Sequence, residues 1–207
     1  MATASSYDES FAAMTEETLR IYPCYETSWQ GAEFPFRARL HGAMSAEALR
    51  DYFFAQCRYG NRGDMPETIE DGAESILARD RIILGGGLVL TCGSFLFYPG
   101  CCSGIETWSD WRSIAKGENS PWMGHDPDAW VDTDGDMAVF HPDIGEDVKT
   151  AKFHYEDIQA ALDVAEEDLR GFLSALEGWL SREGVGRAAD VAEKIREAYR
   201  IPKQGAR

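Results

Sequence analysis

The strongest hydrophobic pattern in the chain is an apolar seam in its C-terminal third. Its members recur at alternating intervals of four and three positions: Ile158, Leu162, Ala165, Leu169, Phe172, Leu176 and Trp179. Such spacing places all of them on one face of an α-helix. Two glycines, Gly184 and Gly186, end the seam, and a second helix is predicted at about 187–199, before Pro202. The last third of the chain is therefore predicted to form a helical hairpin.

Shorter apolar patterns predict strands upstream of that hairpin. The predicted strands lie at 36–40, within 82–98, at 129–131 and 137–140 around an Asp134-Gly135 turn, and at 152–154. We interpret the glycine triplet at 85–87 as a turn or bulge. A phosphate-binding loop would need a helix directly after its glycines, and a strand-like run follows instead.

Helical spacing also recurs before the C-terminal third. The predicted helices lie at 7–22, ended by Pro23, at about 46–57 behind an N-capping Ser45, at 67–79, and at 105–115. In the last of these, Trp108 and Trp111 share a face. Together the patterns predict an α+β fold, with a small and mostly antiparallel sheet, packed helices and a C-terminal helical hairpin.

Domain organisation follows from these elements and from the length of 207 residues. We expect a disordered tail at 1–6, an α+β domain at 7–154, and a helical region at 155–207 packed on it, which together make one domain. The start has neither the cationic nor the apolar region of a signal peptide, and no run approaches the roughly 18 apolar residues of a membrane span. We therefore expect a cytoplasmic protein that does not bind membrane.

The charge is strongly acidic and unevenly distributed. The chain carries a net charge of −16, which disfavours binding to nucleic acid or to anionic membrane. Residues 126–168 contain 14 acids and only two bases, Lys149 and Lys152, so this block alone has a net charge of −12. Such a block is either a solvated face that keeps the protein soluble or a docking surface for a basic protein.

One stretch, 99–127, combines cysteine, histidine, tryptophan, proline and glycine. Cys92, Cys101, Cys102 and His125 supply the ligand types of a zinc site, but zinc sites ordinarily space their cysteines two to four residues apart. Adjacent cysteines in an extended or turn segment would point different ways. This spacing favours buried structural thiols. A thiol nucleophile at Cys102 is a second possibility and would need His125 or His141 as its base.

Two further motifs have plain structural interpretations. Alternate carboxylates at Asp132, Asp134 and Asp136 resemble a calcium loop but lack the glycine and glutamate that an EF-hand requires, so an acidic hairpin tip is expected. The His125-Asp126 pair could serve acid–base chemistry, although Asp126 before Pro127 favours a turn. No other enzyme signature is present, no cofactor is expected, and a role other than an enzyme is favoured.

The stretch also carries a resemblance. Pro99-Gly-Cys-Cys-Ser-Gly, a Trp-containing helix and Ser120-Pro-Trp-Met-Gly-His-Asp-Pro resemble a group of uncharacterised bacterial proteins with a Pro-Gly-Cys-Cys-Cys-Gly turn and a Ser-Pro-Trp-x-Gly-His-Asp-Pro run. The likeness covers roughly 84–180 and implies no known catalytic residue. Ser103 stands where a third cysteine is often found. In size, acidity and lack of catalytic motif, the chain also looks like immunity proteins of bacterial toxin systems.

Two functional hypotheses follow. The first is an immunity-type inhibitor of a basic toxin or effector domain, in which the acidic groups provide charge and an aromatic residue provides an anchor. Its candidate residues are Trp130, Asp132, Asp134, Asp136, Glu166 and Glu167. The alternative is a thiol- or zinc-dependent enzyme or sensor that uses Cys101, Cys102 and His125.

Overall fold

A computed structural model describes residues 18–26, 37–60, 65–83, 85–118, 120–143 and 149–203. The expected tail at 1–6 and most of the predicted helix at 7–22 lie outside these residues. In chain order the elements are β1 (Arg20–Glu26), β2 (Arg37–Arg39), α1 (Ala46–Gly60), α2 (Ile69–Leu77), β3 (Gly86–Cys92), β4 (Phe95–Phe97), η2 (Ile105–Lys116), β5 (Trp130–Asp134), β6 (Met137–His141), β7 (Ala151–His154), α3 (Tyr155–Arg182) and α4 (Ala188–Ala198).

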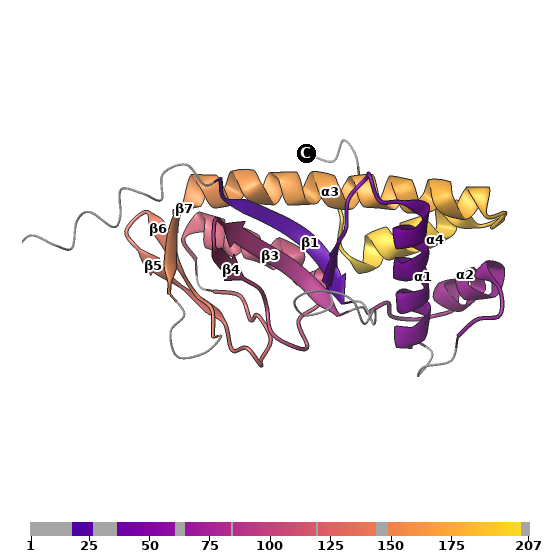
Figure 1. Ribbon diagram of the computed structural model, residues 1–207, viewed down its shortest axis with the longest axis horizontal. Helices are drawn as coiled ribbons and strands as arrows, with labels where there is room; N and C mark the ends of the chain where they lie inside the picture. The colour runs from indigo at the N-terminus through magenta and orange to yellow at the C-terminus, as the bar shows by residue number, and fades with distance from the viewer. Residues whose placement is uncertain are drawn as a thin grey trace, which may run out of the picture.

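The strands form two antiparallel sheets, in the orders β2-β1-β3-β4 and β5-β6-β7. The predicted α+β class is confirmed, with the strands divided between two sheets. The long helix α3 runs the length of the molecule above both sheets, and α4 returns beneath its far end beside α1 and α2 (Figure 1). None of the helices in the described part of the chain is long and apolar enough to cross a membrane.

Strand β1 corrects only the end of the helix predicted at 7–22, because residues 20–22 are extended. Residues 20–25 pair with 86–91 of β3, and burial of one face of this strand outweighs a loose local helical spacing. Pro23 is tolerated within β1 because β2 pairs only with residues 24–26. Beyond that pairing, the Leu40 amide donates to the Pro23 carbonyl at 2.8 Å.

The glycine triplet is another correction, because two of its members lie inside strand β3. Gly86 and Gly87 have backbone φ angles of +148° and +139°, which residues with a side chain rarely adopt. A Cβ on Gly86 would stand 2.3 Å from the Cys24 carbonyl oxygen. The glycines therefore let β3 approach β1 closely, and no turn forms there.

Element η2 explains the spacing of the tryptophans. It is a 3₁₀-helix of 12 residues, and its buried side chains recur at intervals of three: Ile105, Trp108, Trp111 and Ile114. A 3₁₀-helix has three residues per turn, so these four side chains form one continuous apolar row. Phe97 packs edge-on against both Trp111 and Phe140, which joins β4, η2 and β6 in one core.

A buried polar contact fastens the C-terminal end of α4 to the first helix. The hydroxyl of Tyr199 lies 2.8 Å from the hydroxyl of Tyr52 and donates to Gln56 Oε1 at 3.0 Å, and all three side chains are buried. The Tyr199 carbonyl accepts a hydrogen bond from Trp108 Nε1 at 2.8 Å. Helices α1 and α4 and the tryptophan row of η2 therefore converge on one residue.

Replacing Tyr199 by Phe tests this junction, the buried polar contact of Tyr199 with Tyr52 and Gln56. The Tyr199→Phe variant leaves buried oxygens of Tyr52 and Gln56 with one partner fewer, and it should lower the free energy of unfolding by about 1–3 kcal/mol. Urea denaturation followed by circular dichroism measures this loss. The matched control is Tyr59→Phe, because Tyr59 is 57% exposed. Equal stability of the two variants would contradict the assigned role of the junction.

Candidate metal centre

Two backbone segments build the site between them. After β4 the chain passes through Gly100 and Cys101 and enters η2, and the segment after η2 returns antiparallel to it. Cys101 donates its amide to the His125 carbonyl at 2.6 Å, and the His125 amide donates back to the Cys101 carbonyl at 3.1 Å. The Gly100 amide donates to the Met123 carbonyl at 2.7 Å. These hydrogen bonds bring Cys101 and His125 together although 24 positions separate them in the sequence.

Glycines make this close pairing possible. A Cβ on Gly100 would lie 2.2 Å from the Pro127 carbonyl oxygen. Gly124 has φ of +91°, and a Cβ on it would lie 2.5 Å from the Cys101 carbonyl oxygen. Because both positions exclude a side chain, the glycines set the distance between the two segments.

The three potential ligands converge in space. Cys101 Sγ lies 3.6 Å from Cys102 Sγ, 3.4 Å from His125 Nδ1 and 3.6 Å from His125 Nε2. One ligand atom from each residue lies within 4.8 Å of the other two, and the three residues form the one such group of metal-binding side chains in the described part of the chain. All three residues are exposed.

The cysteines correct the expectation that adjacent thiols would be buried and point different ways. Cys102 has φ of +66°, so its backbone lies in the left-handed region. An extended strand would place successive side chains on opposite faces, and this conformation removes that alternation. Both thiols therefore face His125 from one exposed turn, whereas Cys92, also considered as a ligand, is buried.

An acidic residue supports the histidine. Asp126 Oδ2 lies 3.2 Å from His125 Nδ1, and the two side chains are 92% and 55% exposed. A carboxylate on one ring nitrogen directs the other nitrogen towards a metal ion, as is common for metal-bound histidines. The predicted His125-Asp126 pair therefore exists in space, beside the thiols.

Further acidic groups surround the thiols. Hydrogen bonding to Cys102 raises the pKa of Cys101, and desolvation and then the charges of Cys102, Asp126 and Glu26 raise it further. Cys101 is therefore a poorer nucleophile at neutral pH than an unperturbed cysteine, which disfavours it as an activated thiol.

Residues that the sequence did not single out complete these surroundings. Burial, followed by the charges of Glu26, Cys102 and Glu106, raises the pKa of Tyr59 near the end of α1. Glu106 Oε2 is buried and has no hydrogen-bond partner among the described residues. Separation from the cysteines in the chain hid Tyr59 from sequence reasoning, whereas Glu106 lies only four positions after Cys102.

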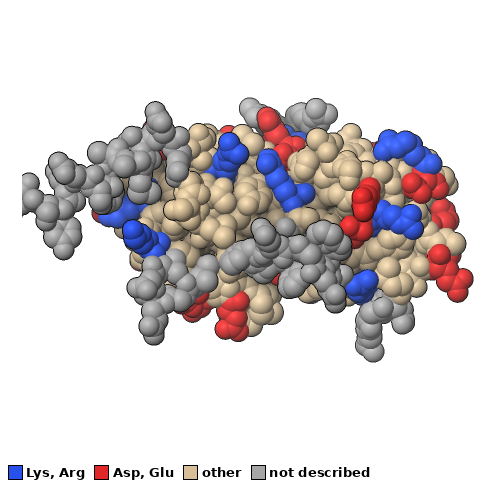
Figure 2. All heavy atoms as spheres, viewed as in Figure 1, with Lys and Arg blue, Asp and Glu red and all other residues tan. Residues whose placement is uncertain are grey.

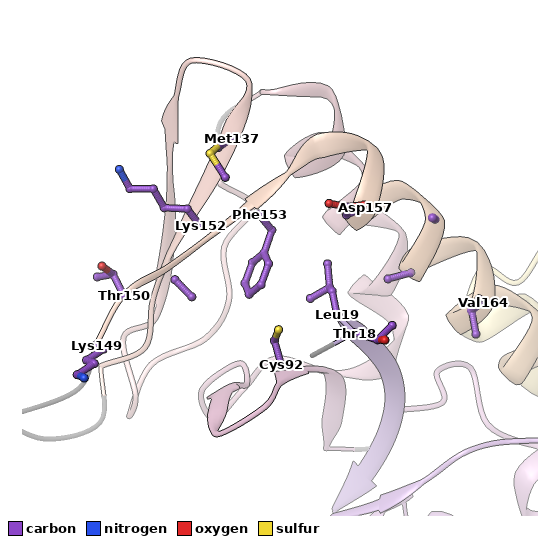
Figure 3. Close-up of a pocket in the computed structure, with 13 residues that line it drawn as sticks. Thr18, Leu19, Cys92, Met137, Lys149, Thr150, Lys152, Phe153, Asp157 and Val164 are labelled. Carbon is purple, nitrogen blue, oxygen red and sulfur yellow. The ribbon is translucent and has the colours of Figure 1, made fainter. Parts of the chain in front are cut away.

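The third cysteine considered as a ligand, Cys92, lines a cavity away from the cluster. It borders a cavity of about 930 Å³ between β7, the start of α3 and the start of β1. Leu19 and Phe153 project into this cavity, and the amine of Lys152 points away from it (Figure 3). Cys92 is therefore not a ligand of the cluster at Cys101.

The acidic hairpin forms as predicted, as β5 and β6. Each of its three carboxylates has a partner on the same sheet: Asp132 lies 3.1 Å from His141 Nε2, Asp134 lies 2.7 Å from Lys152 Nζ, and Asp136 lies 3.3 Å from His154 Nδ1. The hydrogen bond from Lys152 lowers the pKa of Asp134. His141 belongs to this sheet, so of the two bases considered for Cys102 only His125 lies beside it.

Trp130 is an exposed aromatic residue of this sheet. It is 46% exposed and stacks on the ring of His141, with centroids 4.5 Å apart and planes 4° apart. Its Nε1 donates to Asp132 Oδ2 at 3.3 Å. Trp130, Asp132 and His141 therefore form one aromatic and acidic surface.

The two acids of α3 differ in their surroundings. Glu166 bonds Arg112 Nη2 at 2.6 Å and also pairs with Arg170, whereas Glu167 is exposed. Asp168 pairs with Arg39 at 2.6 Å. Two arginines from other parts of the chain, Arg39 and Arg112, therefore pair with acids of α3. Figure 2 shows one face of the molecule, on which basic and acidic residues lie interspersed.

Adding a methyl group at Gly124 tests whether close backbone contact holds the site together. Gly184→Ala is the matched control, because Gly184 has a similar φ of +88° and no atom stands within 4 Å of its Cβ position. The control should lose about 1–2 kcal/mol of unfolding free energy from left-handed strain alone. Gly124→Ala should lose clearly more in urea denaturation, because it also clashes with the Cys101 carbonyl. Equal losses would show that the close contact is unimportant.

The chain matches no protein-family model, no curated protein and no solved structure with which it was compared. The resemblance to proteins with a Pro-Gly-Cys-Cys turn stays a prediction.

Proposed function

We propose that this protein binds a zinc ion reversibly through Cys101, Cys102 and His125. The distances between the ligand atoms carry the proposal. Bonds of about 2.3 Å to sulfur and 2.0–2.1 Å to nitrogen in a tetrahedron separate two sulfurs by about 3.8 Å, and a sulfur from a nitrogen by about 3.6 Å. The corresponding distances here are 3.6 Å between the sulfurs and 3.4–3.6 Å between Cys101 Sγ and the imidazole nitrogens.

The ligand set suits a borderline-soft metal ion. Two thiolates and one imidazole are ligands that zinc prefers over the oxygen ligands of magnesium or calcium. Cys101 and Cys102 would lose their thiol protons on binding, so metal uptake releases protons. The carboxylate of Asp126 would hold the imidazole of His125 in position.

The number of ligands and their exposure define the kind of site. Structural zinc sites are closed by four protein ligands, whereas three protein ligands leave a position for water or a substrate. An ion bound here would act as a Lewis acid towards whatever occupies that position. Because Cys101, Cys102 and His125 are exposed, solvent and competing ligands reach the site. These features favour exchangeable binding, as in a sensor or an open catalytic site, over a structural role.

Zinc titration of the reduced chain against a chromogenic chelator tests the proposal. One ion should bind per chain. Cys101→Ser, Cys102→Ser and His125→Ala should each weaken binding by more than the roughly 10–100-fold that loss of a supporting contact causes.

Two variants control for the mere presence of a cysteine or histidine. Cys92→Ala and His154→Ala remove the same residue types from positions outside the cluster and should leave the affinity unchanged. Circular dichroism verifies that each variant is folded. The absence of stoichiometric binding, or equal losses in the control variants, would refute the proposal.

We propose a second candidate function, an inhibitor that docks on a basic protein, because of the surface around Trp130. The hairpin carries a half-exposed tryptophan bonded to Asp132, together with Asp134 and Asp136 towards its turn, and so combines an aromatic anchor with negative charge. An immunity-type inhibitor of a toxin domain would use such a surface. Glu167 lies exposed on α3, and Glu166 would have to exchange its arginine partners to take part.

Neutralising the hairpin tests this second candidate. A chain with Asp132→Asn, Asp134→Asn and Asp136→Asn should lose capture of a basic partner from cell extract. The matched control neutralises three exposed acids elsewhere, with Glu47→Gln, Glu67→Gln and Asp80→Asn, and should retain the partner. Loss of the partner from both variants would indicate a general charge effect. Retention by both would exclude the hairpin as the docking surface.

A further inference from the structure

The two cysteines of the cluster are also close enough to react with each other. Their sulfurs lie 3.6 Å apart and both side chains are exposed, whereas Cys24, Cys57 and Cys92 are buried. A disulfide bond is about 2.05 Å long, so the sulfurs need to approach by about 1.5 Å. The left-handed backbone at Cys102 already turns both thiols to the same side.

We propose that Cys101 and Cys102 are a redox pair that a hydroperoxide converts into a disulfide between adjacent residues. Formation of the disulfide depends on the arrangement of the two thiols alone. Its consequence for metal binding rests on the proposed zinc site, since a disulfide removes both thiolate ligands. The protein would then have two exclusive states, a reduced state that binds zinc and an oxidised state that does not.

The reaction balances with hydrogen peroxide as the oxidant. One thiolate attacks a peroxide oxygen, which breaks the oxygen–oxygen bond, forms a sulfenic acid and releases hydroxide. The second thiol attacks the sulfenic sulfur, forms the sulfur–sulfur bond and expels a second hydroxide. The hydroxides take up the thiol protons as water. Two thiols and one peroxide therefore give one disulfide and two waters, and two electrons pass from sulfur to oxygen.

The geometry of neighbouring residues makes this disulfide easy to reduce. Adjacent Cα atoms lie about 3.8 Å apart across a trans peptide, below the usual disulfide separation of about 4.4–6.8 Å. Strained and exposed disulfides are the labile ones, which ordinary thiols reduce. The oxidised state should therefore return to the dithiol when a small thiol is added, as a switch requires and a structural disulfide does not.

Oxidation of the full-length, metal-free chain tests the inference. Treatment with an equivalent of hydrogen peroxide should lower the thiol content of the denatured protein from five to three. The mass should fall by two hydrogen atoms, and fragmentation should place the bond between Cys101 and Cys102. A small thiol should restore all five thiols. Loss of other thiols, or addition of oxygen with no loss of hydrogen, would overturn the inference.

Variants and a zinc arm separate this inference from the proposed function. Cys101→Ser and Cys102→Ser should form no intramolecular disulfide, and Cys92→Ser should form it as the wild type does. In zinc-loaded protein, peroxide should release the ion to a chromogenic chelator as the disulfide appears. A disulfide that forms in a chain unable to bind zinc would refute the zinc site and leave the redox pair. Zinc binding by a chain that forms no disulfide would refute the redox pair and leave the zinc site.

Discussion

The close approach of two backbone segments, 99–102 and 123–127, is the constraint on which the candidate metal centre depends. Backbone hydrogen bonds join Cys101 to His125 in both directions, and the absence of side chains at Gly100 and Gly124 permits their spacing. The same turn holds Cys102 in a left-handed conformation. One local backbone geometry therefore sets both sulfur–nitrogen and sulfur–sulfur distances, which are the quantities that zinc binding and disulfide formation require.

Neighbouring elements fix this turn within the fold. η2 follows directly after it and buries a row of apolar side chains at intervals of three, so the exit from the turn is anchored in the core. Trp108 of that row bonds the carbonyl of Tyr199 at the end of α4. Pairing of Gly85 with Gly104 links the turn to the sheet just before β3. An exposed site is thus supported by buried structure, which is how reactive groups keep a defined geometry in water.

The strong negative charge has different effects in different places. On α3 and the hairpin, basic side chains from distant elements partner several carboxylates, among them Arg39, Arg112 and Lys152. Around Cys101, the charges of Asp126 and Glu26 act on a thiol. Acidic surroundings of this kind attract a cation, so the net charge of the chain and the proposed zinc site agree with each other.

The sequence predicted the regular elements better than it predicted the site. Periodicity located α3 and α4, Ser45 capped α1 as expected, and Trp108 and Trp111 did share a face. Residues 20–22, the end of the helix predicted before Pro23, are extended because pairing with β3, more than 60 residues away, decides that segment. The prediction that Cys101 and Cys102 are buried was wrong because it assumed ordinary backbone angles. A left-handed residue and a bridge across 24 positions leave no periodic signal.

X-ray absorption at the zinc edge of the loaded protein measures which atoms of this turn bind the ion. The expected first shell holds two sulfurs at about 2.3 Å and an imidazole nitrogen at about 2.0–2.1 Å, completed by one light atom from solvent. In the His125→Ala variant, the imidazole contribution should disappear while both sulfurs remain. A shell made only of nitrogen and oxygen, or one holding a single sulfur, would contradict zinc binding through Cys101, Cys102 and His125.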